Sequence, residues 1–80
     1  MKIRFYGRLA DLIGREIDLD VPGPVSVADL FRRLAQMYSD AGDPLLNPRV
    51  RAVVGNQLVP QDFMLHPEDK LEILPIVSGG

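Results

Sequence analysis

The segment Lys70-Leu71-Glu72-Ile73-Leu74-Pro75-Ile76-Val77-Ser78-Gly79-Gly80 combines a strand pattern with a glycine-rich end. Leu71 and Ile73 alternate with Lys70 and Glu72, which predicts a final β-strand over residues 70–74 with the two apolar side chains facing a core. Pro75 has no amide hydrogen to donate, so we expect strand pairing to stop there. The Gly-Gly pair has no side chains to bury and therefore adds nothing to a core.

Residues 75–80 are consequently predicted to form an extended, flexible C-terminal tail. Six extended residues span roughly 20 Å at about 3.3 Å each, whereas a domain of this size has a radius of gyration of about 12 Å. The tail is therefore long enough to carry the carboxylate of Gly80 well clear of the folded body. A terminal Gly-Gly pair arises by chance in roughly 0.5% of chains at average glycine usage, so the pair alone is suggestive and not decisive.

Length and composition indicate one small globular domain. Eighty residues provide one core, and 46% hydrophobic with 25% charged residues is ordinary for a soluble protein. The chain has no cysteine, which excludes a disulfide framework, a thiol nucleophile and a cysteine-based zinc site. A net charge of −2 with scattered basic residues argues against nucleic-acid binding. Because neither a signal peptide nor a membrane-spanning apolar run is evident, we expect a cytoplasmic protein with no membrane association.

Apolar residues at every second position predict strands over residues 2–6, 16–21, 49–54, 57–59 and 70–74. Ile3 and Phe5 are expected to face the core from the first strand. Apolar residues at helical spacing predict a short helical turn after that strand, over Leu9–Ile13. Gly55-Asn56 is a turn signal between the third and fourth strands.

A main helix is predicted to begin at the N-cap Ser26, with Asp29 placing a favourable negative charge in its first turn. One face of this helix is apolar and consists of Val27, Leu30, Phe31, Leu34 and Tyr38. The helix is expected to end at residues 39–44 and to be followed by a connecting loop through Pro48. One amphipathic helix packed on one sheet is an economical two-layer arrangement of the α+β class.

This ββαβββ order, together with the tail, resembles the ubiquitin-like sulfur carriers, and within them the small subunits of molybdopterin synthases most closely. The resemblance covers essentially the whole chain and is strongest over residues 52–59 and 65–80; residues 5–14 also match. One departure is Ile76, where many relatives have a second proline. The resemblance implies a β-grasp fold, with a mixed sheet of about five strands on one main helix, in a single domain spanning residues 1–80.

The resemblance also implies chemistry at Gly80. In this family a ubiquitin-activating-like adenylating enzyme couples the terminal carboxylate to AMP, and sulfur from a persulfide donor then displaces AMP to leave a thiocarboxylate. In molybdopterin synthase, the tail enters the large subunit and delivers this sulfur to a pterin precursor. The carrier is expected to bind no metal and no tight cofactor, with the AMP adduct and the thiocarboxylate as transient modifications. The catalytic side chains would then belong to the partner.

The residues predicted to bind a partner belong to the tail and to one apolar surface. The tail would enter the partner through Pro75, Ile76, Val77, Ser78 and Gly79, ahead of Gly80. Tyr6 and Leu74 are large apolar residues on the otherwise charged phase of the first and last strands. If these strands are parallel neighbours, as the β-grasp fold implies, Tyr6 and Leu74 lie beside the tail. Leu58 matches a third apolar surface position in the family.

Two interpretations of Tyr6 and Leu74 stay open at this point. They could form a docking patch in which Tyr6 contributes an amphipathic side chain. Alternatively, a loop of the same chain could cover them, since single exposed apolar residues are common on protein surfaces.

Other candidate sites are weaker. His66 lies in a predicted loop without evident partners for metal binding or acid–base chemistry, and we predict an ordinary loop histidine. Glu16, Asp18 and Asp20 alternate on one strand and are expected to form a solvated face.

Three functions therefore remain open: a sulfur carrier for molybdopterin, a carrier for thiamine or another thiolated metabolite, and a ubiquitin-like modifier conjugated through Gly80 to lysines. The chain length and the match around Asn56 favour the first.

Overall fold

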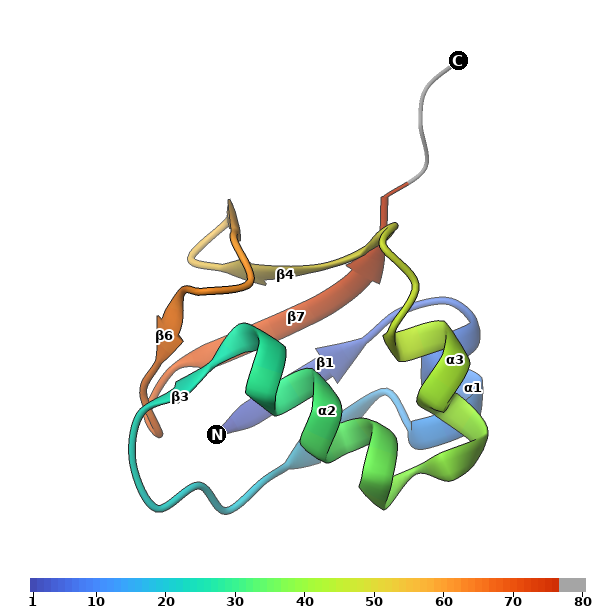
Figure 1. Ribbon diagram of the computed structural model, residues 1–80, viewed down its shortest axis with the longest axis horizontal. Coiled ribbons are helices and arrows are strands. Elements are labelled where there is room, and N and C mark those ends of the chain that lie inside the picture. The colour runs from blue at the N-terminus through green and yellow to red at the C-terminus, as the bar shows by residue number, and fades with distance from the viewer. Residues whose placement is uncertain (77–80) are drawn as a thin grey trace.

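A five-stranded mixed sheet lies at the centre of the computed structural model, which describes residues 1–76 (Figure 1). Its strand order is β2-β1-β7-β4-β5, with bounds Glu16–Asp18, Lys2–Phe5, Lys70–Pro75, Val50–Val54 and Gln57–Val59. A separate two-stranded sheet pairs β3, Val25–Ser26, with β6, Met64–Leu65. The predicted mixed sheet of about five strands is confirmed.

The last strand, β7, occupies the middle of the sheet between β1 and β4 (Figure 1). It runs parallel to β1, with Lys70 beside Lys2 and Ile73 beside Phe5. It runs antiparallel to β4, from the pair Val54 and Leu71 to the pair Val50 and Pro75. The expectation that the first and last strands are parallel neighbours is therefore confirmed.

The main helix, α2, spans Val27–Met37 and crosses one face of the sheet (Figure 1). Its N-cap is Ser26, as predicted, and the Ser26 Oγ accepts a hydrogen bond from the Asp29 amide at 3.1 Å. The short helix α1, Arg8–Ile13, confirms the predicted helical turn. Among the described residues, no helix has the length and apolar character needed to cross a membrane.

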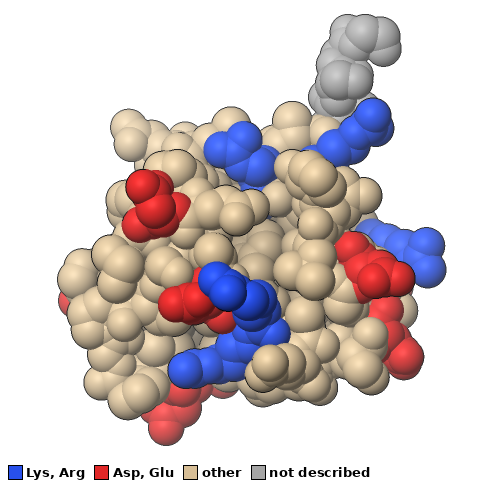
Figure 2. Space-filling model, viewed as in Figure 1, with Lys and Arg blue, Asp and Glu red and all other residues tan. Residues whose placement is uncertain are grey.

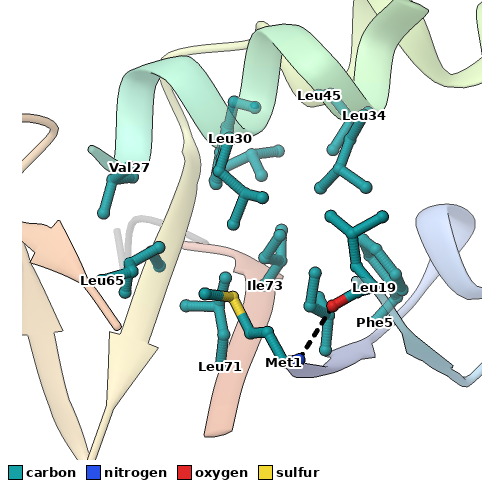
Figure 3. Packing of buried hydrophobic residues seen from close by; sticks show 14 of the residues in the cluster. Met1, Phe5, Leu19, Val27, Leu30, Leu34, Leu45, Leu65, Leu71 and Ile73 are labelled. Carbon is teal, nitrogen blue, oxygen red and sulfur yellow. Dashed lines mark hydrogen bonds between the residues drawn. The ribbon is translucent and has the colours of Figure 1, made fainter. Parts of the chain in front are cut away.

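The core lies between α2 and the sheet. Figure 3 shows Val27, Leu30 and Leu34 pointing from α2 toward side chains of the strands. The strands contribute Ile3, Phe5, Leu65, Leu71 and Ile73, all essentially inaccessible to solvent. Because burying one such side chain contributes about 1.5–3 kcal/mol, this layer accounts for most of the packing that holds β7 in place.

The predicted loop after α2 is wrong in part. Residues 39–45 form a 3-10 turn, Ser39–Ala41, followed by the short helix α3, Gly42–Leu45. Ala41 and Leu45 are buried there, and α3 packs against α2. Pro44 does not prevent the helix, because amides in the first helical turn have no intrahelical acceptor and one of them is dispensable.

The second predicted strand is shorter in the structure than its alternation indicated. It ends at Asp18, although Leu19 and Val21 are both buried. The Leu19 amide donates to the Met1 carbonyl at 2.8 Å, and the Leu19 carbonyl accepts from the Met1 amino group at 2.8 Å (Figure 3). These two bonds continue the antiparallel register of Lys2 and Asp18 by one further pair, so only the end of the predicted strand, at Val21, reflects burial without pairing.

The prediction that pairing stops at Pro75 is also wrong. Pro75 is the last residue of β7 and lies opposite Val50. The next amide, that of Ile76, donates to the Arg49 carbonyl at 2.7 Å. Proline lacks only its own amide hydrogen, so the residue after it still bonds to β4. The sheet thus holds Pro75 and Ile76, here called the tail root, which were predicted to belong to the free tail.

Replacing Ser26 by alanine should lower the free energy of unfolding by about 1 kcal/mol, because the Asp29 amide loses its acceptor. Chemical denaturation of purified protein would measure this change. Ser39→Ala is the control, since Ser39 is exposed and begins the 3-10 turn without a side-chain cap. Equal losses in the two variants would contradict the assignment of Ser26 as the cap.

A negative charge introduced on one face of β7 should destabilise the fold far more than the same charge on the other face. Ile73→Glu should abolish the cooperative thermal transition, because Ile73 is fully buried and the new carboxylate would have no partner. Leu74→Glu should cost about 1 kcal/mol or less, since Leu74 is half-buried and lies opposite Arg51. Thermal unfolding followed by circular dichroism distinguishes the two, and the reverse ranking would mean that the strand faces are inverted.

Candidate functional site

The tail root occupies a fixed place at the end of the central strand. Pro75 closes the ladder with Val50, and the Ile76 amide is held by the Arg49 carbonyl at 2.7 Å. The chain beyond Ile76 therefore starts from the C-terminal end of β7, between β1 and β4. Val77, Ser78, Gly79 and Gly80, which carry the predicted tail chemistry, lie outside the described residues.

Next to the tail root, the sheet face that points away from α2 carries four apolar side chains. Val53 pairs with Leu58 across β4 and β5, in the opposite phase to buried Ala52 and Val59. Leu58 is 52% exposed and Tyr6 is 38% exposed, whereas Val53 and Leu74 are half-buried. We call these residues, Tyr6, Val53, Leu58 and Leu74, the docking face.

A shallow hollow of about 470 Å³ joins part of the docking face to the tail root. Its lining includes Tyr6, Val53, Leu74 and Pro75. The structure therefore places Tyr6 and Leu74 at the same end of the sheet, as the sequence predicted. Leu74 is half-buried and lies opposite Arg51 in the pairing of β7 with β4. Val53 was missed, although the alternation of Val50, Ala52 and Val54 toward the core implied that Val53 points outward.

A polar row borders the docking face on the β1 side. The Tyr6 hydroxyl donates a hydrogen bond to the Glu72 carboxylate, which restrains the ring on the surface. Arg4 lies beside Glu72 in the parallel ladder and forms an ion pair of 3.7 Å with Glu16. The pKa of the Arg4 guanidinium is raised, first by the neighbouring Tyr6 hydroxyl and then by the Glu16 and Glu72 carboxylates. The apolar surface thus has a charged border, an arrangement typical of protein interfaces.

The other candidate residues lie apart from this surface or within the polar row. The His66 amide donates to the Asp69 carboxylate at 2.8 Å in the turn that precedes β7. Asp18 accepts from the Met1 amino group at 3.4 Å. Within residues 1–76, no group of three or more histidine, cysteine or acidic side chains is arranged to hold a metal ion. Of the residues that the sequence predicted for partner binding, those in the described part of the chain belong to the tail root and the docking face.

Two solved structures resemble this fold closely. Molybdopterin converting factor subunit 1 from Pyrococcus furiosus superposes with a TM-score of 0.78 at 21% sequence identity, and the match covers 95% of each chain. Small archaeal modifier protein 1 from Haloferax volcanii superposes with a TM-score of 0.77 at 19% identity, again over 95% of each chain. At such identities the likeness demonstrates the shared ubiquitin-like β-grasp fold.

Comparison with curated protein sequences finds no match. A family model described as the ThiS family matches residues 3–80, which is nearly the whole sequence. The match includes β1 from Ile3 onward, the docking face, the tail root and both terminal glycines. This protein belongs to the ThiS family.

Proposed function

We propose that this protein is a sulfur carrier that acts through the terminal carboxylate of Gly80. The observation that supports the proposal most directly is the placement of the tail root. The Ile76 amide is hydrogen-bonded to the Arg49 carbonyl at the end of the central strand, and Ile76 lines a hollow together with Tyr6 of the docking face. A partner that binds the docking face would receive residues 77–80 from a defined starting point. Membership of the ThiS family over residues 3–80 supports the same interpretation.

The chemistry begins with activation of the carboxylate, which is a poor electrophile. An adenylating enzyme transfers AMP from ATP to the Gly80 carboxylate and releases pyrophosphate. The outer sulfur of a persulfide donor attacks the carbonyl carbon of this mixed anhydride, AMP leaves, and an acyl disulfide forms. A thiol of the donor enzyme then cleaves the S–S bond and becomes part of a disulfide, which leaves Gly80 as a thiocarboxylate, whose sulfur is a far better nucleophile than the original oxygen. The chain has no cysteine, so the carried sulfur resides on the terminal carbonyl carbon and not on a side chain.

The preferred recipient is a pterin precursor in molybdopterin synthesis. In this proposal the protein is the small subunit of molybdopterin synthase, and its tail enters the active site of the large subunit. The resemblance around Asn56 and the fold shared with molybdopterin converting factor subunit 1 support this choice. The dithiolene product needs two sulfurs, so two loaded carriers are consumed for each product. A related recipient, thiamine or another thiolated metabolite, would use the same loading steps.

A protein-modifier function is the second candidate. It is favoured by the equally close fold of small archaeal modifier protein 1. Both functions share the adenylate of Gly80 and diverge only afterwards. A carrier adenylate reacts with a persulfide, whereas a modifier is transferred to the amino group of a lysine and forms a stable amide.

Loading should be visible as a change in mass. Incubation with an adenylating enzyme, ATP, a persulfide donor and a thiol reductant should exchange one oxygen for one sulfur, and fragmentation should locate the exchange at Gly80. Intact-protein mass spectrometry measures both. An unchanged mass, in a reaction that loads an authentic carrier, argues against the sulfur-carrier proposal. Stable lysine adducts would favour the modifier function instead.

Sulfur delivery should depend on the length of the tail. Deleting Gly80, or adding one residue after it, displaces the reacting atom from its position in the partner site. Because a displacement of about 1 Å can cost on the order of 100-fold in rate, transfer to the pterin precursor should fall at least that far. The thermal midpoint should hardly change, because residues 1–76 contain the core. Full turnover by the lengthened chain would exclude a fixed position for the tail.

The docking face should contribute affinity independently of the tail. Leu58→Glu should weaken binding to the large subunit by about thirtyfold, if its loss costs about 2 kcal/mol as for a central interface side chain. Met37→Glu is the matched control, because Met37 is 51% exposed, against 52% for Leu58, and lies at the end of α2. Both variants should keep their stability within about 0.5 kcal/mol. Isothermal titration calorimetry would reveal equal affinities if the docking face were not an interface.

A further inference from the structure

Among the described residues, the hollow that adjoins the tail root is lined by two cationic residues and by no acidic residue, although the whole chain has a net charge of −2. This hollow of about 250 Å³ is also lined by the apolar or neutral side chains of Pro44, Pro75 and Ile76 among others. The charged residues in its lining are Arg8 and Arg49, both exposed and both cationic. Figure 2 shows basic side chains at the end of the molecule where β7 finishes. We call Arg8 and Arg49 the arginine pair.

The backbone fixes the arginine pair next to the tail root. Arg8 is the first residue of α1 and follows the Gly7 turn that ends β1. Arg49 immediately precedes β4, and its carbonyl accepts the Ile76 amide at 2.7 Å. Arg8 and Arg49 therefore belong to the two segments that adjoin the end of β7, and both line the hollow that contains Pro75 and Ile76.

Neither member of the arginine pair forms an ion pair with an acidic side chain in the part of the chain that the structure describes. Within residues 1–76, the side-chain ion pairs of arginine are Arg4 with Glu16 and Arg32 with Asp29. The larger hollow beside α2, about 520 Å³, differs in this respect, because its Arg32 is bonded to Asp29 at 2.8 Å. The positive charge at the tail root is thus available to a ligand, whereas part of the charge beside α2 is already compensated.

We propose that the arginine pair binds carboxylate side chains that surround the entrance of the partner site receiving the tail. This inference rests on the proposed function, because it concerns the same partner. Arginine presents a planar set of donors that matches a carboxylate in a two-pronged geometry. The pair also adjoins the apolar docking face, since Tyr6 lines both hollows. An apolar centre with a charged rim is the ordinary anatomy of a protein interface.

The length of the tail favours a protein carboxylate over the AMP group as the ligand. Four residues separate Ile76 from the end of the chain, and extended they span about 13 Å. An adenylated Gly80 would therefore lie deep in the partner site, whereas the arginine pair stays at its entrance. The expected partner surface is an acidic rim around a narrow channel.

The test compares two double variants of equal charge. Arg8→Gln with Arg49→Gln, and Arg32→Gln with Arg33→Gln, each remove two positive charges and change the formal net charge from −2 to −4. All four arginines are exposed, so both variants should remain folded. Stopped-flow association with the adenylating enzyme and with the synthase large subunit, at about 50 and 200 mM salt, measures electrostatic attraction.

The arginine-pair variant should associate about tenfold more slowly than the wild-type protein at low salt, with a flatter salt dependence. The α2 variant should stay within about twofold of wild type, because its charges lie away from the tail root. If the wild-type protein binds and both variants associate at the same rate, the inference is wrong while the proposed function stands.

A wild-type protein that binds neither enzyme would instead contradict the proposed function. Binding of carboxylates by the arginine pair is then tested by NMR titration of the full chain with a hexaglutamate peptide. Amide shifts concentrated at Arg8, Arg49 and Ile76 would support an acidic partner for this end of the sheet. Shifts of equal size around Arg32 and Arg33, or none at all, would overturn it.

Discussion

The pairing of β7 with β1 on one side and β4 on the other is the constraint on which the rest of the structure depends. Leu71 and Ile73 point from this strand into the core under α2, while Glu72 and Leu74 point to the opposite face. The two ends of the sequence must therefore meet in the middle of the sheet before the core can close. The docking face and the tail root both follow from this one arrangement, because both are built around the same strand.

In the same arrangement, the folded residues position the tail, and the proposed partner enzymes carry out the chemistry on it. The described residues supply a rigid origin for the tail and an apolar surface with a charged border, and they contain no metal-binding group of side chains. In the proposed mechanism the enzymes that bind the docking face provide the reactive groups, and this domain presents its own terminus as their substrate.

Much of this architecture was predictable because it follows from alternation and capping. Ile3, Phe5, Leu71 and Ile73 face the core as their spacing indicated, and Ser26 caps α2 through its hydroxyl. The parallel pairing of β1 and β7 was different, since no local pattern encodes it. That prediction came from the resemblance to a family and not from periodicity.

The errors have physical causes of a similar kind. The strands β3 and β6 have two residues each, too few for any periodicity to be recognised. The helix α3 is a single turn whose Gly42 and Pro44 resemble loop residues. Pro75 was predicted to end the pairing, yet the Ile76 amide continues it. Val53 was overlooked because both neighbours, Ala52 and Val54, are also apolar, which hides the two faces of β4.

The central position of β7 has a consequence for how the protein is made. Lys2 and Lys70 are neighbours in the sheet but far apart in the sequence, and such distant contacts slow folding. During synthesis, the backbone groups of β1 and β4 that pair with β7 stay unpaired until residues 70–75 have left the ribosome. A chain terminated before β7 lacks the strand that carries Leu74 and completes the docking face. Products truncated before β7 would therefore fail to fold, and would not compete with complete chains for the enzymes that load them.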